Sequence, residues 1–145
     1  MFIVLDTNVL ISGQLSKRGN EAIILDYHKQ SLFQIAVNED IFEEYARVLK
    51  YPHIRAKHRW SSEHMTQFLS DFRKSVVFVK TTEKERVSSD PDDDKFFHCA
   101  KAAHADFLVS GDEHHILPIS VYGETEIVSP KQFVDLIQAE YQRAA

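Results

Sequence analysis

The chain has 145 residues and a formal net charge of −5, with 43% hydrophobic and 27% charged residues. A chain of this length and ordinary composition is able to bury a core, so we expect residues 1–145 to form a single domain. The negative charge argues against a protein that holds nucleic acid by overall electrostatic attraction, although the basic residues are unevenly spread.

Nothing in the sequence indicates secretion or a membrane segment. Cys99 is the only cysteine and cannot form a disulfide within the chain. The opening stretch MFIVLDTNVLIS lacks a basic start and reaches Asp6 too early for a signal peptide. No apolar run approaches the length needed to span a membrane. We therefore expect a cytoplasmic protein that does not contact membranes.

Short apolar runs alternate with amphipathic stretches along the chain. Asn38, Ser61 or Ser62, and Ser129 followed by Pro130 mark helix starts, because these residues favour the first turn of a helix. In chain order, the pattern predicts a strand at 2–5, a helix near 20–30, a strand at 31–37, a helix at 39–49 ended by Tyr51 and Pro52, a helix from Ser61 or Ser62 to about residue 74, a strand at 76–79, a loop at 80–92, a helix from Asp93 to His104, a strand at 107–110, a fifth strand at 126–128, and a helix from Pro130 to about Tyr141.

This alternation predicts an α/β fold with a central parallel sheet covered by helices on both faces. In open α/β sheets, ligands bind beyond the carboxyl ends of the strands. Asp6 directly follows the first predicted strand, and Asp112 follows the fourth, two residues after Ser110. The sequence therefore predicts two carboxylates where this architecture places its chemistry. Taken alone, either Asp could instead serve a turn through local hydrogen bonds to the backbone.

The predicted helix at 39–49 offers a further carboxylate to the same region. Its apolar residues define one face at about 100° per residue. On that wheel Glu43 lies nearly opposite the core, whereas Glu44 lies at the edge of the apolar face, beside Val48. We therefore expect Glu43 to face solvent and Glu44 to reach a site that borders the core.

Four acids stand within five positions in the stretch DPDDD at 90–94. When the apolar face of the following helix is extended back one turn, it includes Asp93, while Asp94 turns away and Asp92 lies toward the flank. Asp93 is therefore the predicted inward-facing acid, with capping of the helix as its alternative role. Asp90 and Asp94 stay open as contributors to the same position.

The segment Tyr45–Ser62 contains no acid and several basic residues. Basic side chains can neutralise RNA phosphates, and Tyr51 or Trp60 could stack on unpaired bases. The alternative is a solvated helix end and loop. The residues predicted to contact nucleic acid are Arg47, Lys50, Arg55, Lys57 and Arg59.

Four stretches together resemble the PIN domain, and more narrowly its VapC-like branch, the toxins of toxin–antitoxin pairs. The resemblance implies a three-layer α/β/α sandwich with a central parallel sheet of about five strands, and a ribonuclease that depends on Mg²⁺ or Mn²⁺. It covers essentially the whole chain in order, through FIVLDTNVLISG, FEEYARVL, DDDKFFHCAKAAHADFLVSGD and the terminal SPKQFVDLI.

At the matching positions the resemblance implies a site with specific roles for individual residues. Asn8 and Ser110 would hold the carboxylates in place. One or two Mg²⁺ or Mn²⁺ ions would neutralise the acids and orient a water for attack on phosphorus. Expected partners are an RNA substrate, a cognate antitoxin protein and a second copy of the chain in a homodimer. The implied catalytic and metal-binding acids are Asp6, Glu44, Asp93 and Asp112.

Alternative functions fit fewer residues. A zinc site at His114 and His115 lacks further ligands at suitable spacing. A Mg²⁺-dependent phosphatase of the haloacid-dehalogenase type would need an acid where Asn8 stands, and a receiver-like signalling domain would need an acid near Lys80. A catalytically inactive PIN fold that binds RNA or protein is the remaining alternative to the ribonuclease.

Overall fold

A six-stranded sheet lies at the centre of the protein, and the computed structural model describes residues 1–144. The strand order is β3-β2-β1-β4-β6-β5, and every neighbouring pair is parallel except β5 and β6. The strands are β1 (Phe2–Leu5), β2 (Gln34–Val37), β3 (Val77–Phe78), β4 (Phe107–Val109), β5 (Val121–Tyr122) and β6 (Thr125–Val128).

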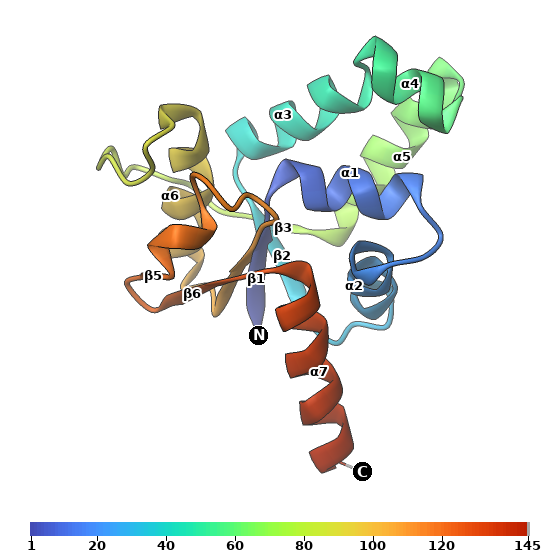
Figure 1. Ribbon diagram of the computed structural model, residues 1–145. Coiled ribbons are helices and arrows are strands. Elements are labelled where there is room, and N and C mark those ends of the chain that lie inside the picture. Colours follow the sequence, from blue (N-terminus) through green and yellow to red (C-terminus); the bar gives the residue numbers. More distant parts are fainter. Residues whose placement is uncertain (145) are drawn as a thin grey trace.

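Helices cover both faces of this sheet, with α6 on one face and α1, α2 and α7 on the other (Figure 1). The predicted α/β fold is therefore confirmed. No helix among residues 1–144 is both long and apolar enough to cross a membrane. The helices are α1 (Thr7–Leu15), α2 (Asn20–Lys29), α3 (Glu39–Leu49), α4 (Pro52–His58), α5 (Ser62–Ser75), α6 (Asp94–Ala103) and α7 (Pro130–Ala144), with 3-10 turns at Pro91–Asp93 and Leu117–Ile119.

Three predicted helix starts are confirmed by their capping hydrogen bonds. The Asn38 side chain accepts from the backbone N of Ile41 at 2.8 Å and so begins α3. Ser61 begins α5 by accepting from the backbone N of His64 at 3.0 Å. Ser129 accepts from the backbone N of the residue three positions on at 3.2 Å, and Pro130 opens α7. Each cap satisfies an amide that lacks a partner in the first helical turn.

The sheet has one strand more than predicted, and three predicted strands are shorter, the one at 107–110 by a single residue. The stretch at 31–37 becomes strand only from Gln34, because Ser31 takes a left-handed backbone conformation with φ of 62° and turns the chain. The stretch at 76–79 pairs only at Val77–Phe78. The added strand, β5, turns back on β6 through Gly123, which has φ of 58°. An antiparallel edge strand therefore joins the parallel sheet.

Two helices were not predicted, α1 and α4. The residues of α1 include Gly13, which allows α1 and α2 to approach closely. A Cβ at Gly13 would lie 2.9 Å from the backbone O of Glu21 and 2.5 Å from Leu25 Cδ1. Helix α4 begins with Pro52 at its first position, so the proline that was expected to end one helix begins the next.

A second, smaller apolar cluster fixes α3, α4 and α5 to one another. It contains Leu49, Ile54 and Met65, and Trp60 packs against it. The Trp60 ring stacks on His64 with centroids 4.3 Å apart and tilts against Phe68 at 5.3 Å. The Trp60 ring therefore packs within the protein, and the stacking of Tyr51 or Trp60 on RNA bases stays a prediction. Tyr51 is 38% exposed.

Candidate active site

Two aspartates follow neighbouring strands at the centre of the sheet. Asp6 comes directly after β1, and its backbone N donates to the backbone O of Val109 at the end of β4 (3.0 Å). Asp112 stands three residues beyond Val109. Because β1 and β4 are parallel neighbours, their carboxyl ends lie side by side. The topology therefore brings these two acids together at one edge of the sheet.

Ser110 links Asp6 to Asp112. Its side chain is fully buried, and its hydroxyl donates to Oδ2 of Asp6 at 2.7 Å. The Ser110 hydroxyl oxygen also accepts from the backbone N of Asp112 at 3.0 Å. The hydroxyl thus fixes the orientation of one carboxylate and the position of the backbone that carries the other.

Asp93 is the acid with the least hydrogen bonding. It lies at the end of the 3-10 turn that precedes α6, and its side chain makes no capping hydrogen bond. Its Oδ2 is buried and has no hydrogen-bond partner among the described residues. A buried carboxylate oxygen without a donor is costly, because neither water nor protein compensates its lost hydration. This oxygen is chemically suited to a cation.

The pKa of Asp93 is raised to about 7, first by burial and then by the negative charges of Asp6, Asp90 and Asp112. The nearby His115 acts in the opposite direction. Burial likewise raises the pKa of Asp6 to about 6, although the hydrogen bond from Ser110 lowers it. Glu44 and Asp112 contribute further to the rise at Asp6. The charge of Asp112 therefore acts on both Asp6 and Asp93, and the charge of Asp6 acts on Asp93, as expected of acids that share one edge of the sheet.

The neighbours of Asp93 have structural roles. The Asp90 side chain accepts from the backbone N of Asp92 at 3.0 Å and so begins the 3-10 turn. Asp94 was expected to turn away from the core, and this is wrong: it is 5% exposed. Its carboxylate accepts from the backbone N of Ser88 at 2.7 Å and from Arg86 Nε at 3.0 Å. Asp94 is buried because the loop at residues 86–88 lies over it and supplies these donors, so Asp94 holds the preceding loop.

Glu44 extends from α3 toward the same region, and both of its oxygens already have partners. The Thr7 hydroxyl donates to Oε2, and the Lys95 ammonium donates to Oε1 at 2.7 Å. Arg47 lies farther away, at 3.7 Å from Oε1. Glu43 is exposed, as predicted. Glu44 therefore stands beside the aspartates with its charge already balanced.

Asp112 combines a turn with its place at the sheet edge. Its Oδ1 accepts from the backbone N of both His114 and His115, each at 2.9 Å. Although partial burial acts to raise the pKa of Asp112, these two bonds and the nearby imidazoles hold it below its ordinary value. The His115 ring is held by Ser89, with Nδ1 and the hydroxyl oxygen 2.8 Å apart. Asp112 therefore stabilises a turn, as the alternative interpretation expected, and also belongs to the acid group.

Some residues at the site depart from the sequence-based picture. Asn8, expected to support a carboxylate, is exposed on the first turn of α1, and in the described chain its side chain has no hydrogen-bond partner. The supporting hydroxyl comes from its neighbour Thr7 instead. Lys95 was not singled out either, although it follows the acid run directly. A basic residue next to four acids is the signal that could have found it.

The acids fit a hard divalent cation held partly through water. Within residues 1–144, no three His, Cys, Asp or Glu side chains already form a closed set of metal ligands. Mg²⁺ does not need one, since it keeps several waters and is commonly bound by one or two carboxylates. The unpaired Oδ2 of Asp93 and the raised pKa values of Asp6 and Asp93 are what a cation at this position would relieve.

Comparison with protein families gives a match over most of the chain. The sequence pattern of the PIN domain matches residues 2–114, which include all four acids. The chain belongs to the PIN domain family. A search of curated protein sequences returned no match. PIN domains are generally nucleases that act on RNA and use divalent metals, so family membership assigns a nuclease-type function and does not favour a phosphatase or a receiver-like domain.

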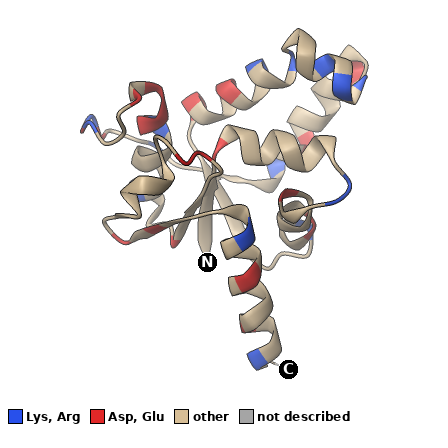
Figure 2. Cartoon of the chain, viewed as in Figure 1, with Lys and Arg blue, Asp and Glu red and all other residues tan. Residues whose placement is uncertain are grey.

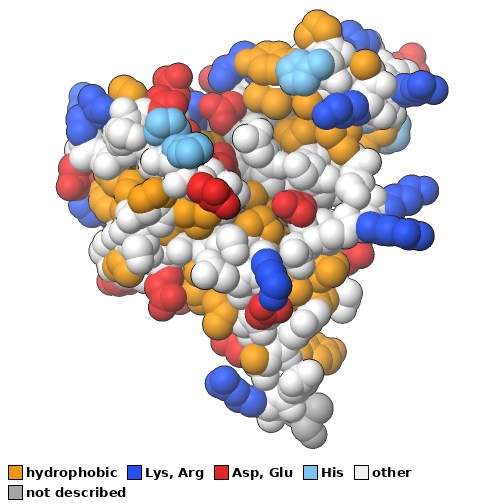
Figure 3. Space-filling model, in the orientation of Figure 1, with side chains coloured by type: hydrophobic (Ala, Val, Ile, Leu, Met, Phe, Trp, Pro, Cys, Tyr) orange, Lys and Arg blue, Asp and Glu red, His pale blue; other side chains and the backbone are white. Residues whose placement is uncertain are grey.

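Charge is separated along the face of this PIN domain that carries the acids. Acidic positions cluster near the start of α1, on α3 and in the loop after β4, while basic positions mark α4 at the far end of the arm formed by α3 and α4 (Figure 2). The space-filling view shows acidic side chains near the centre of this face and basic ones toward its edge (Figure 3). The five predicted RNA-contacting residues, Arg47, Lys50, Arg55, Lys57 and Arg59, are all exposed.

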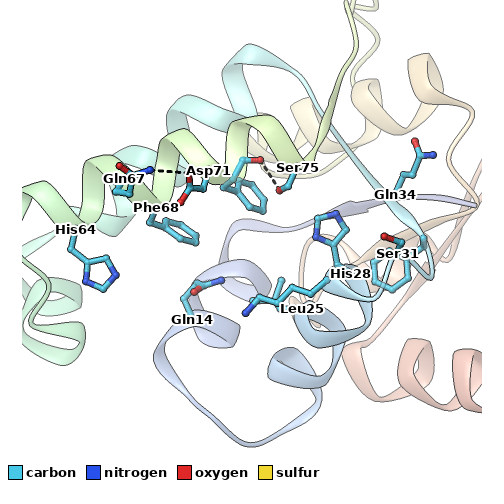
Figure 4. A pocket seen from close by; sticks show the side chains of 13 residues that line it. Gln14, Leu25, His28, Ser31, Gln34, His64, Gln67, Phe68, Asp71 and Ser75 are labelled. Carbon is cyan, nitrogen blue, oxygen red and sulfur yellow. Dashed lines mark hydrogen bonds between the residues drawn. The ribbon is translucent and has the colours of Figure 1, made fainter.

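A cavity of about 690 Å³ lies elsewhere in the PIN domain, between α1, α2 and α5 (Figure 4). Leu25 and Phe68 line it together with His28 and His64, and Gln67 Nε2 donates to Asp71 Oδ1 at 2.9 Å. None of the four acids borders it. The acid group is the better candidate for catalysis, because it gathers carboxylates around an oxygen of Asp93 that is buried and has no hydrogen-bond partner among the described residues, whereas the polar groups of this cavity include a satisfied pair.

Proposed function

We propose that the protein is a metal-dependent endoribonuclease that hydrolyses RNA phosphodiester bonds with Mg²⁺ or Mn²⁺. The observation that carries this proposal is the buried Oδ2 of Asp93, which has no partner and lies within electrostatic reach of Asp6 and Asp112. In a PIN domain, such a group favours a working cation site over a fold that binds RNA without cleaving it.

In this proposal Asp6, Asp93 and Asp112 hold the cation. A bound Mg²⁺ or Mn²⁺ would supply Lewis-acid activation of water and of the phosphate. Ser110 keeps the Asp6 carboxylate in one orientation through its 2.7 Å hydrogen bond. Glu44, whose oxygens are already paired, orients the attacking water from the side of α3 rather than binding the ion directly.

RNA would lie along the arm formed by α3 and α4. The basic residues Arg55, Lys57 and Arg59 are exposed at the far end of this arm. From Glu44 to the end of α3 is about 8 Å along the helix axis, a distance that one or two nucleotides can bridge. Basic side chains beyond the acids would bind the phosphates that flank the cleavage point.

We further propose that the chain is the toxin of a toxin–antitoxin pair. The support is the likeness of its motifs to the VapC-like branch of the PIN family. The partner would then be a cognate antitoxin protein, and the chain itself would act as a homodimer. A protein that copurifies with the chain and suppresses its RNA cleavage would identify this partner.

The decisive experiment compares Asp6→Asn with the parent chain in an RNA digest with Mg²⁺, with Mn²⁺ and with EDTA. Asparagine keeps the size of Asp6 and can still accept from Ser110, but it removes one negative charge from the cation site. We expect the parent to cleave RNA only with added metal, and Asp6→Asn to lose at least about 100-fold in rate.

Glu43→Gln is the matched control, because Glu43 is an exposed acid one position from Glu44. It removes the same charge from the same helix and should cleave at the parental rate. Cleavage by the parent in EDTA, or parental activity in Asp6→Asn, would show that the acids do not form the active site.

A further inference from the structure

Lys95 and Glu44 form an ion pair at the border of the acid group. The ammonium nitrogen lies 2.7 Å from Oε1 of Glu44, and the two side chains are only 19% and 17% exposed. Removing an ammonium from water is costly unless an opposite charge and hydrogen bonds compensate. The pair is therefore part of the folded structure and not a chance contact between mobile surface side chains.

The backbone on both sides of the pair is tied together. Asn38 caps α3, the helix that carries Glu44, and its side-chain nitrogen donates to the backbone O of Lys95 at 3.4 Å. The Thr7 hydroxyl holds the other oxygen of Glu44. Asn38 therefore fixes the backbone of Lys95 beside α3, and Thr7 fixes the side chain of Glu44, so that the two charges of the pair are held close together.

The pair divides the four acids into two groups. Asp93 has a buried oxygen, Oδ2, with no hydrogen-bond partner among the described residues, whereas Thr7 and Lys95 each donate to an oxygen of Glu44. A second divalent ion in such a nuclease would need free carboxylate oxygens on the Glu44 side. Both oxygens of Glu44 are already engaged, one by a cation.

From this geometry we propose that the Lys95 ammonium takes the place of a second divalent cation beside Glu44, so that the centre binds a single divalent ion on Asp6, Asp93 and Asp112. The inference rests on the proposed metal-dependent function and specifies the number of ions. Lys95 is a positioning residue in this account: it neutralises Glu44 and fixes its orientation.

The test counts Mn²⁺ ions bound per chain, by equilibrium titration followed by electron paramagnetic resonance of the free ion. The parent should bind one Mn²⁺ ion. Lys95→Met keeps most of the side-chain volume but removes the charge, which leaves Glu44 free to bind metal. This variant should bind two ions, and adding Glu44→Gln to it should restore one.

Lys101→Met is the matched control. Lys101 is on the same helix, α6, and its ammonium lies 2.7 Å from Glu83 in a more exposed ion pair away from the four acids. This variant should bind one ion, as the parent does. If Lys95→Met still binds one ion, or if the parent binds two, Lys95 does not replace a second cation.

Glu44→Gln alone tests the proposal without removing Lys95. It should still bind one Mn²⁺ ion, because Glu44 is not a ligand; loss of binding would overturn the inference even if Lys95→Met failed to fold. The proposed function fails separately: a parent that binds no Mn²⁺ and cleaves no RNA would refute both, whereas a parent that cleaves RNA with two bound ions would refute only the assignment of Lys95.

Discussion

Asp93 and Asp94 are adjacent in the chain but have opposite surroundings. Asp94 accepts hydrogen bonds from two backbone amides and from Arg86, so its negative charge is well compensated. Asp93 has a buried oxygen with no donor, and the charges around it are mostly negative. The number of donors that reach each carboxylate, and not the residue type, therefore separates a structural acid from one available to a cation.

Titration of the acid group should lower stability as pH rises in metal-free buffer. The pKa values of Asp6 and Asp93 are raised to about 6 and about 7, so the folded state holds protons that the unfolded state releases near pH 4. Their contribution to stability is full below about pH 4 and is lost as pH rises to about 7. For Asp6 alone we expect a loss of about 1–2 kcal/mol between pH 5 and pH 7.

The measurement is thermal or urea unfolding of the parent and of Asp6→Asn across this pH range in EDTA. Comparing the two chains is necessary because burial lowers the pKa of His28, which changes stability in the opposite direction. The parent should lose stability relative to Asp6→Asn as pH rises, and saturating Mg²⁺ should restore the parent by about 2.7 kcal/mol at a hundredfold excess over its dissociation constant. A stability difference independent of pH would mean that Asp6 does not titrate in this range.

The arm formed by α3 and α4 carries an acid of the candidate site at one end and basic residues at the other. Its near end carries Glu44, and its far end carries Arg55, Lys57 and Arg59, none of which pairs with an acid in the part of the chain that the structure describes. The arm is fixed to α5 by the cluster around Leu49, Ile54 and Met65. Exposed side chains at its tip can therefore be changed without disturbing the acids.

Replacing Arg55, Lys57 and Arg59 together with Ser should weaken RNA binding and leave the metal response intact. Each basic residue that contacts a phosphate contributes to the salt dependence of binding, so the slope of log affinity against log salt should flatten by about 2 for three contacts to single-stranded RNA. The affinity of the triple variant for labelled RNA at several salt concentrations checks this.

Lys74→Ser is a suitable control for the triple variant, since Lys74 is an exposed basic residue in the last turn of α5. It should change neither the affinity nor the salt slope. An unchanged slope in the triple variant would remove the tip of the arm from the RNA path.

The sequence was most informative where local chemistry decides the structure. The caps at Asn38 and Ser61, the exposed Glu43 and the acids after β1 and β4 follow from residue type and spacing. The pairing of Lys95 with Glu44 could not be predicted in this way, because it depends on how α3 and α6 pack.

Helices and strands were predicted less well where the sequence pattern was weak or where the structure depends on contacts with distant parts of the chain. Helix α1 has no apolar stripe, since Val9, Leu10 and Ile11 are all buried in sequence, so its residues show no helical period. Strand β5 has only two residues and exists because it pairs with β6. The start of α6 was misplaced by one residue, and the burial of Asp94 was missed because it depends on the loop at residues 86–88 folding over the helix.

At the scale of the whole molecule, we expect a homodimer. A stable interface covers about 800 Å² per partner, about a tenth of the 8451 Å² accessible surface. The large exposed apolar side chains are distributed over several elements and do not mark one interface. The prediction is therefore limited to the mass of the dimer. Light scattering at micromolar concentration should report twice the mass of the 16.8 kDa chain, and a monomer would contradict the prediction.

The order of the strands has a consequence for how the protein is made. Strand β4 lies between β1 and β6 in the centre of the sheet, although it comes late in the chain. During synthesis, Asp6, Glu44 and Asp93 leave the ribosome well before β4 and Asp112 can join them. The four acids of this PIN domain can therefore come together only after β4 and Asp112 have been made, so the acid group cannot assemble on a shorter nascent chain.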